Sequence, residues 1–142
     1  MRIAIASDHA GYRYKQVVVR WLQDRQWDVA DFGTSSEEPV DYPDFVRPAA
    51  AAVAAGQCSL GIVFGGSGNG EAMAANRFRG IRCAVCWNVD AARYARVHND
   101  ANMIAIGSRF VGEDSLIAIV ETWLDATFEG GRHVQRLVKL DA

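Results

Sequence analysis

Residues 60–75, LGIVFGGSGNGEAMAA, decide the fold of this chain. A short apolar run at 62–64 meets a loop with four glycines at 65–70, and Glu71 then opens a segment of good helix formers. This succession of strand, glycine turn and helix is typical of an α/β protein. Glycine lets a ligand approach the backbone closely, and the first turn of a helix offers unpaired N–H groups. The loop therefore predicts a site for an anion or a developing oxyanion.

The acid at the end of this loop separates it from the common nucleotide-binding loops. A Walker loop has Lys at the position of Glu71, and a dinucleotide loop has a small residue there and follows the first strand. A carboxylate beside N–H donors indicates proton transfer, with Glu71 as a base next to an oxyanion hole. Alternatively, Glu71 only stabilises the start of its helix. The loop by itself leaves both interpretations open.

Composition restricts the class of protein. The 142 residues are 50% hydrophobic and 23% charged, which predicts one domain over 1–142 with a hydrophobic core. A net charge of −2 without a basic stripe argues against nucleic acid as a partner. No apolar run approaches the roughly 20 residues that span a membrane, and the first residues do not resemble a signal peptide. We therefore expect a cytoplasmic protein.

The cysteines predict core packing rather than chemistry. The chain has three cysteines, an odd number that does not suggest a disulfide framework. Cys83 and Cys86 have CxxC spacing, but an offset of three in a strand points the side chains to opposite faces. We expect these two in the core and assign no role to Cys58.

The remaining pattern alternates strands and helices. Strands are expected at 2–6, 28–32, 59–64, 82–86 and 103–106, and helices at 11–25, 44–55, 90–97, 113–124 and 132–140, besides the helix opened by Glu71. This alternation predicts a five-stranded parallel sheet with helices on both faces, followed by a C-terminal arm. In a flavodoxin-like order, 2-1-3-4-5, ligands bind beyond the carboxyl ends of strands one and three. That places Asp8 and His9 beside the glycine loop, which favours the catalytic interpretation of Glu71.

Each other candidate residue has a plainer alternative. Asp8 could only cap a helix, and His9 could be a solvated loop residue. His98 could satisfy carbonyl groups at a helix end. Arg132 and Arg136 stand four apart, so on a helix they share a face and could grip a phosphate together. The spacing of Asp8, His9, His98 and Asp100 does not support a metal site, and we expect none.

Six motifs together resemble a known family over nearly the whole chain. They are SDHAG at 7–11, DYP at 41–43, GGSGNGE at 65–71 with AAN at 74–76, HND at 98–100, GSR at 107–109 and FEGGRH at 128–133. In this order they are similar to the ribose-5-phosphate isomerase B family, in a wider group that includes galactose-6-phosphate isomerase subunits.

The resemblance implies a Rossmann-like three-layer αβα sandwich, no metal or organic cofactor, and a homodimer or dimer of dimers. It implies interconversion of ribose 5-phosphate and ribulose 5-phosphate through a cis-enediolate. One branch of the family uses a cysteine just before the glycine loop as base. Gly65 stands at that position here, so the chain matches the other branch, in which the acid at the end of the loop is the base.

The resemblance also implies a role for each site residue. Glu71 would move the proton, Asp8 would handle protons on the sugar oxygens, and His98 would open the ring. The other implied contacts are enediolate binding by the Ser67 hydroxyl and the amides of Gly66, Gly68, Asn69 and Gly70, a sugar hydroxyl on Asn99, and phosphate binding by His9, Arg109, Arg132 and Arg136. His98, Asn99 and Arg109 are expected to face the glycine loop of a partner subunit.

Three questions stay open on sequence grounds. The substrate could be another sugar phosphate, such as a hexose 6-phosphate or a tetrulose 4-phosphate, because the catalytic loop handles only C1 and C2. A non-catalytic flavodoxin-like nucleotide-binding module is a rival of a different class. The helix N-terminus lowers the pKa of Glu71 and burial raises it, and the sequence does not say which effect is larger.

Overall fold

The structure, a computed structural model, describes residues 1–142 and contains five strands and six helices. The strands are β1 (Arg2–Ser7), β2 (Asp28–Asp31), β3 (Leu60–Gly65), β4 (Cys83–Val85) and β5 (Met103–Gly107). The helices are α1 (Tyr12–Asp24), α2 (Pro43–Ala54), α3 (Asn69–Ala75), α4 (Val89–Asn99), α5 (Glu113–Asp125) and α6 (Arg132–Leu140). The predicted elements are all present, with ends that differ by up to a few residues.

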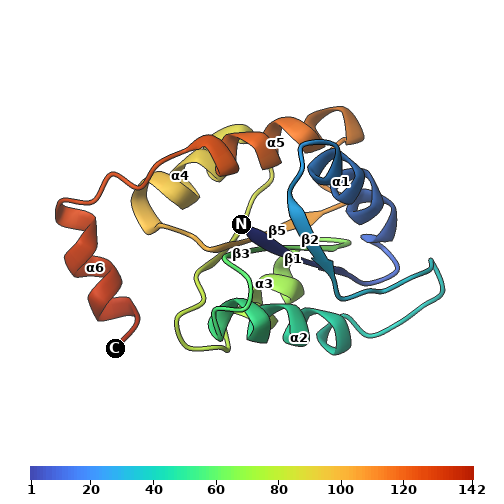
Figure 1. Cartoon of the computed structure of the whole chain (residues 1–142), viewed down its shortest axis with the longest axis horizontal. Coiled ribbons are helices and arrows are strands. Elements are labelled where there is room, and N and C mark those ends of the chain that lie inside the picture. The colour runs from blue at the N-terminus through green and yellow to red at the C-terminus, as the bar shows by residue number, and fades with distance from the viewer.

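The strands form one parallel sheet between two helical layers, which confirms the predicted three-layer α/β fold. Figure 1 shows α1, α4 and α5 on one face of the sheet and α2 and α3 on the other. None of the helices is both long enough and apolar enough to cross a membrane.

The order of the last two strands differs from the prediction. The sheet runs β2-β1-β3-β5-β4, so β5 rather than β4 pairs with β3. All five residues of β5 are buried, as a central position requires, whereas β4 has three residues and its last, Val85, is exposed. Since β4 to β5 now steps back along the sheet, the right-handed crossover rule moves α4 to the opposite face from α3. There α4 packs against α5.

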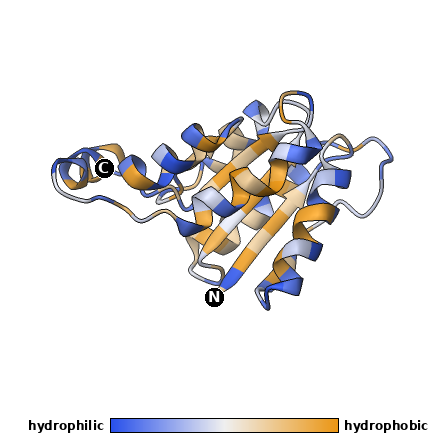
Figure 2. Ribbon diagram, turned by 90° about the horizontal axis from the view of Figure 1, so that it is seen from above, coloured by the Kyte–Doolittle hydropathy of each residue, from blue (hydrophilic) through white to orange (hydrophobic).

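Two hydrophobic clusters, one on each face of the sheet, form the core. In β1, Ile3 and Ile5 belong to the cluster under α1, α4 and α5, while Ala4 and Ala6 belong to the cluster under α2 and α3. This alternation is the period of two that a strand imposes on its side chains. Figure 2 shows strands that are hydrophobic over most of their length, surrounded by helices in which hydrophobic and hydrophilic residues are mixed.

The cysteines lie where the strand geometry predicts. Cys83 belongs to one cluster and Cys86 to the other, so the two thiols are on opposite faces of the sheet. Both are free and buried, as is Cys58. Burial raises the pKa of Cys83 far above its ordinary value and that of Cys86 to about 12. These thiols are therefore core groups, as expected.

The C-terminal helix α6 extends away from the three layers (Figures 1 and 2). Its only buried side chain is His133, which lies against α4. The apolar side chains of Val134, Val138 and Leu140 are exposed. The predicted arm is thus a helix attached at both ends, by His133 against α4 and by an ion pair of 2.8 Å between Asp141, just after α6, and Arg82.

Candidate active site

The glycine loop lies between the end of β3 and the start of α3, at the carboxyl edge of the sheet. Gly68, just before α3, has φ +82°, in the left-handed region that favours glycine. The loop after β5 lies directly beside it, because the Ser108 amide donates to the Gly65 carbonyl (2.8 Å) and the Arg109 amide donates to the Gly66 carbonyl (2.9 Å). The approach is so close that a Cβ on Gly107 would lie 2.3 Å from the backbone of Ser67.

Glu71 is folded back into this loop rather than extended into solvent. The residue is 4% exposed, and its carboxylate lies against the last residue of β3. A Cβ on Gly65 would be 2.3 Å from the carboxyl carbon of Glu71, so only glycine at position 65 leaves room for this conformation. A carboxylate that only stabilised the helix end would not need to be buried.

The environment of Glu71 answers the question about its pKa. Burial raises the pKa of the carboxyl, and the negative charge of Asp8 raises it further. Hydrogen bonds from the backbone N–H groups of Glu71 and Gly68 oppose this shift, but the pKa still lies above its ordinary value. Desolvation is therefore the larger effect, and it moves this carboxylate toward the basicity that a general base needs.

Asp8 and His9 lie on the neighbouring loop, after β1. Asp8 is 9% exposed, and its Oδ1 accepts a hydrogen bond from the Gly11 amide at 3.0 Å. Asp8 therefore does accept a hydrogen bond at the start of α1, as the plainer interpretation predicts. Its negative charge is also close enough to Glu71 to raise the pKa of that carboxyl. The His9 ring is not merely solvated, since its Nδ1 accepts a hydrogen bond from the Val40 amide (3.1 Å). This leaves Nε2 of a neutral ring as the N–H donor.

The Ser67 side chain also lies at the loop. Its Oγ accepts a hydrogen bond from the Asn69 amide at 3.1 Å. Because the hydroxyl accepts this bond, its own proton remains free to be donated to another group.

Arg109 lies near the glycine loop of its own chain. A Cβ on Gly66 would be 3.3 Å from the Arg109 Nε atom. The expectation that Arg109 faces the loop of a partner subunit is therefore wrong. The strand order explains the difference, because pairing of β5 with β3 places the residue after β5 beside the residue after β3.

Tyr42, in the DYP motif, has no role predicted from the sequence, but the structure places it at the same loop. A Cβ on Gly70 would lie 2.6 Å from its ring and 2.8 Å from its hydroxyl oxygen. The phenol covers the start of α3, one residue from Glu71. No periodic signal in the sequence points to this contact, since it joins the start of α2 to a loop almost 30 residues further along.

A second group of predicted residues lies at the other edge of the sheet. His98 and Asn99 end α4, which returns from the carboxyl edge to the amino edge, and Arg132 and Arg136 are exposed on α6. Within one chain these four residues do not meet Glu71, and Asp8 and His9 do not meet His98 and Asp100. The set of four that was considered for a metal is thus not assembled in a single chain.

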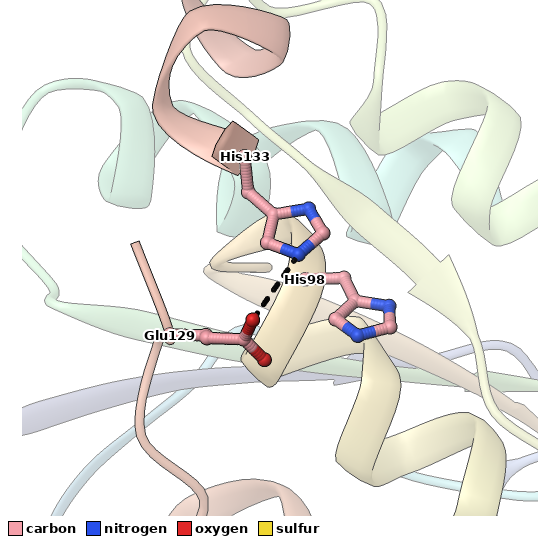
Figure 3. A group of neighbouring side chains, drawn as sticks. All are labelled: His98, Glu129 and His133. Atoms are coloured by element: carbon pink, nitrogen blue, oxygen red, sulfur yellow. Dashed lines mark ion pairs between the residues drawn. The ribbon is translucent and has the colours of Figure 1, made fainter. Parts of the chain in front are cut away.

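His98 is held between two rings. Its imidazole lies 4.8 Å from the ring of Tyr94 and is stacked on that of His133 at 4.5 Å, measured between centroids. Figure 3 shows this pair with Glu129. Burial lowers the pKa of His133, the neighbouring His98 lowers it further, and Glu129 acts in the opposite direction. Sequence reasoning gave His133 and Glu129 no role, although both belong to the FEGGRH motif; Glu129 lies in the segment before α6 and His133 in its first turn.

The hollows of a single chain do not enclose the glycine loop. Two hollows border it: one of about 160 Å³, lined in part by Ser67, Trp87 and Phe110, and one of about 430 Å³ that includes Asn69. A larger hollow, about 630 Å³, lies elsewhere, between residues 76–84 and the end of α6, and of the predicted site residues it includes only Asn99. None of these three hollows is lined by Gly66, Gly70 or Glu71, so none of them encloses the catalytic end of the glycine loop.

Fold and site together define an α/β enzyme in which a buried carboxylate of raised pKa lies beside a glycine loop at the carboxyl edge of the sheet. Comparison with known proteins agrees: the family described as Ribose/Galactose Isomerase matches residues 3–140. This chain belongs to that family, and it is an isomerase. The resemblance predicted from the six motifs is confirmed.

Individual relatives are similar along nearly their whole length. Ribose-5-phosphate isomerase B of Escherichia coli is 44% identical over 141 residues, which cover 99% of this chain and 95% of the relative. The structure of Clostridium thermocellum ribose-5-phosphate isomerase B has a TM-score of 0.97 at 50% identity, over 99% of this chain and 95% of the other. A Mycoplasma genitalium ribose-5-phosphate isomerase B with bound ribulose-5-phosphate has a TM-score of 0.94 at 39% identity, over 98% and 93%.

Proposed function

We propose that this chain interconverts ribose 5-phosphate and ribulose 5-phosphate in the cytoplasm, with Glu71 as the general base. The observation that carries the proposal is the Glu71 carboxylate, buried against Gly65 beside Asp8 and at the mouth of the glycine loop. The relatives named ribose-5-phosphate isomerase B support the choice of substrate.

The reaction moves one proton along the open-chain sugar. Glu71 removes the proton from C2 of the aldose, and the electrons shift to the carbonyl oxygen at C1 to give a cis-enediolate. Peptide N–H groups of the glycine loop and the Ser67 hydroxyl stabilise the negative oxygen. Asp8 transfers a proton between the oxygens at C1 and C2, and Glu71 returns its proton to C1 to form the ketose.

His98 and the arginines of α6 act from a second copy of the chain. They lie at the opposite edge of the sheet from Glu71, so in a homodimer or dimer of dimers they reach the partner's glycine loop. There His98 protonates the ring oxygen and opens the furanose, and Asn99 holds a sugar hydroxyl. The phosphate is then bound by Arg132 and Arg136 of one subunit with His9 and Arg109 of the other. Several arginines are favoured at a doubly charged phosphate, because each guanidinium carries a positive charge and can donate two parallel hydrogen bonds to phosphate oxygens.

The test compares purified protein on sugar phosphates with four, five and six carbons, in the presence of EDTA. We expect the highest kcat/KM on ribose 5-phosphate and deuterium incorporation at C1 of ribulose 5-phosphate formed in D₂O. Glu71→Gln should fold but lose about 10²–10⁴ in turnover, the usual cost of losing a general base. Near-normal turnover of that variant rejects Glu71 as the base.

Three outcomes of this test would change the proposal. Preference for a hexose 6-phosphate or a tetrulose 4-phosphate would keep the mechanism and change the substrate. Activity on no sugar phosphate, together with binding of a nucleotide, would favour a flavodoxin-like binding module. Loss of activity in EDTA would reopen a role for a metal.

A further inference from the structure

Two imidazoles and a carboxylate converge where α4 meets the start of α6 (Figure 3). The ligand atoms of His98, Glu129 and His133 all lie within 4.8 Å of one another. His133 Nε2 and Glu129 Oε1 are 3.8 Å apart. Two histidines and one carboxylate are a ligand set that suits Zn²⁺ and similar borderline divalent cations.

His133 is buried with one of its ring nitrogens unpaired. Its residue is only 5% exposed, and its Nε2 has no hydrogen-bond partner. Buried polar atoms are nearly always hydrogen-bonded, so an exception calls for an explanation. This nitrogen points toward the Glu129 carboxylate in Figure 3, where a bound cation would satisfy both groups.

The backbone already holds the three ligands together. The Glu129 amide donates to the Val97 carbonyl of α4 at 3.0 Å, and the His133 amide donates to the Gly130 carbonyl at 3.1 Å. His98 lies one residue after Val97. Zn–N and Zn–O bonds of about 2.0–2.2 Å require ligand atoms roughly 3.3–3.5 Å apart. Rotation of the three side chains can bring their ligand atoms this much closer together. It can also turn the stacked imidazoles of His98 and His133 so that the nitrogen lone pair of each points at the same cation.

We propose that His98, Glu129 and His133 form a binding site for Zn²⁺ or a cation like it, and that a cation bound there inhibits the isomerase. Inhibition rests on the proposed function, because a metal on His98 occupies the nitrogen that would otherwise deliver a proton to the ring oxygen. Arg132 and Arg136 add positive charge nearby and weaken the site. The cation is an inhibitor here, not a cofactor of the reaction.

Binding is measured on the full-length protein after EDTA treatment, by calorimetry with Zn²⁺ and by the visible absorption of Co²⁺. We expect one cation per chain and a tetrahedral Co²⁺ spectrum, with no response to Mg²⁺. Glu129→Gln and His133→Asn should each weaken binding about tenfold or more. Glu121→Gln, an exposed glutamate on α5, is the matched control and should bind normally.

Two results overturn the site: no Zn²⁺ binding, or binding that is equally tight in Glu129→Gln and His133→Asn. Glu129 is exposed, so its variant remains informative if His133→Asn fails to fold.

Activity is a separate readout. Zn²⁺ should lower turnover of the cyclic sugar, and Glu129→Gln should need about tenfold more Zn²⁺ for the same inhibition. Binding without inhibition would overturn the inhibitory effect and the role of His98 in ring opening, while the metal site would stand. Absence of binding with normal isomerase activity would overturn the metal site alone.

Discussion

Gly65→Ala should inactivate the enzyme by displacing Glu71. The new Cβ would lie 2.3 Å from the Glu71 carboxyl carbon and from Oε2, and 2.4 Å from Oε1. Non-bonded atoms prefer about 3.5–4.0 Å, so the carboxylate must retreat by more than about 1 Å. The backbone of Gly65 tolerates alanine, because this residue is not among the glycines with positive φ.

The size of the loss follows from that displacement. A reacting group misplaced by 1 Å can cost about 10²-fold, and complete loss of a general base costs about 10²–10⁴. We therefore expect kcat/KM to fall by about 10²–10⁴, which is roughly 3–5 kcal/mol of transition-state stabilisation. Crowding at a buried position should also lower the free energy of unfolding by about 1–3 kcal/mol.

The assays are steady-state isomerisation and thermal or urea unfolding, in two backgrounds. In Glu71→Ala the obstructing carboxylate is absent, so adding Gly65→Ala should cost little further activity and little stability. Activity of Gly65→Ala within about threefold of the parent, or equal destabilisation of both backgrounds, would show that the new methyl group does not displace Glu71.

Three further predictions concern charge and burial. Since the folded state raises the pKa of Glu71, it binds more protons than the unfolded chain, and the Glu71 contribution to stability falls as pH rises above the ordinary glutamate range. Glu71→Gln should therefore have a higher Tm than the parent at pH 7, with the difference disappearing below that range; a lower Tm at pH 7 would contradict the assigned shift. Arg136→Ala should raise KM for phosphorylated sugars with little change in kcat and Arg136→Lys should restore part of the affinity, whereas unchanged binding of a phosphorylated inhibitor would remove Arg136 from the phosphate site. Cys83 and Cys86 should resist iodoacetamide in the folded protein and react on unfolding, because both are buried and have raised thiol pKa values; rapid labelling of the folded protein, followed by mass spectrometry, would contradict their place in the core.

Local sequence accounts for much of the site. The strand, glycine loop and helix around Glu71 follow from apolar runs, glycines and helix formers that act within a few residues of one another. The opposite faces of Cys83 and Cys86 follow from the period of a strand. The position of Asp8 beside the glycine loop needed one assumption about topology, that β1 and β3 are neighbours, and the sheet confirms it.

Other features depend on contacts between distant segments. Pairing of β3 with β5 sets the face that α4 covers and brings Arg109 to its own glycine loop. The sequence shows a glycine at position 65 and an acid at position 71. It does not show that the Glu71 carboxylate packs against Gly65, which is a contact of the folded chain. The meeting of Glu129 and His133 with His98 likewise requires α6 to return to the end of α4.

Local sequence was enough to predict which elements form and to which family the chain belongs, and it singled out the residues for which a role in catalysis is proposed. Tertiary structure decided which strand lies beside which, and whether the acid of the glycine loop is solvated or buried. The physical reason is that propensity and periodicity act over a few residues, whereas strand pairing and desolvation are set by segments far apart in the chain. The basicity of Glu71 is a property of that packing, because it arises from the water that the surrounding strands and loops exclude.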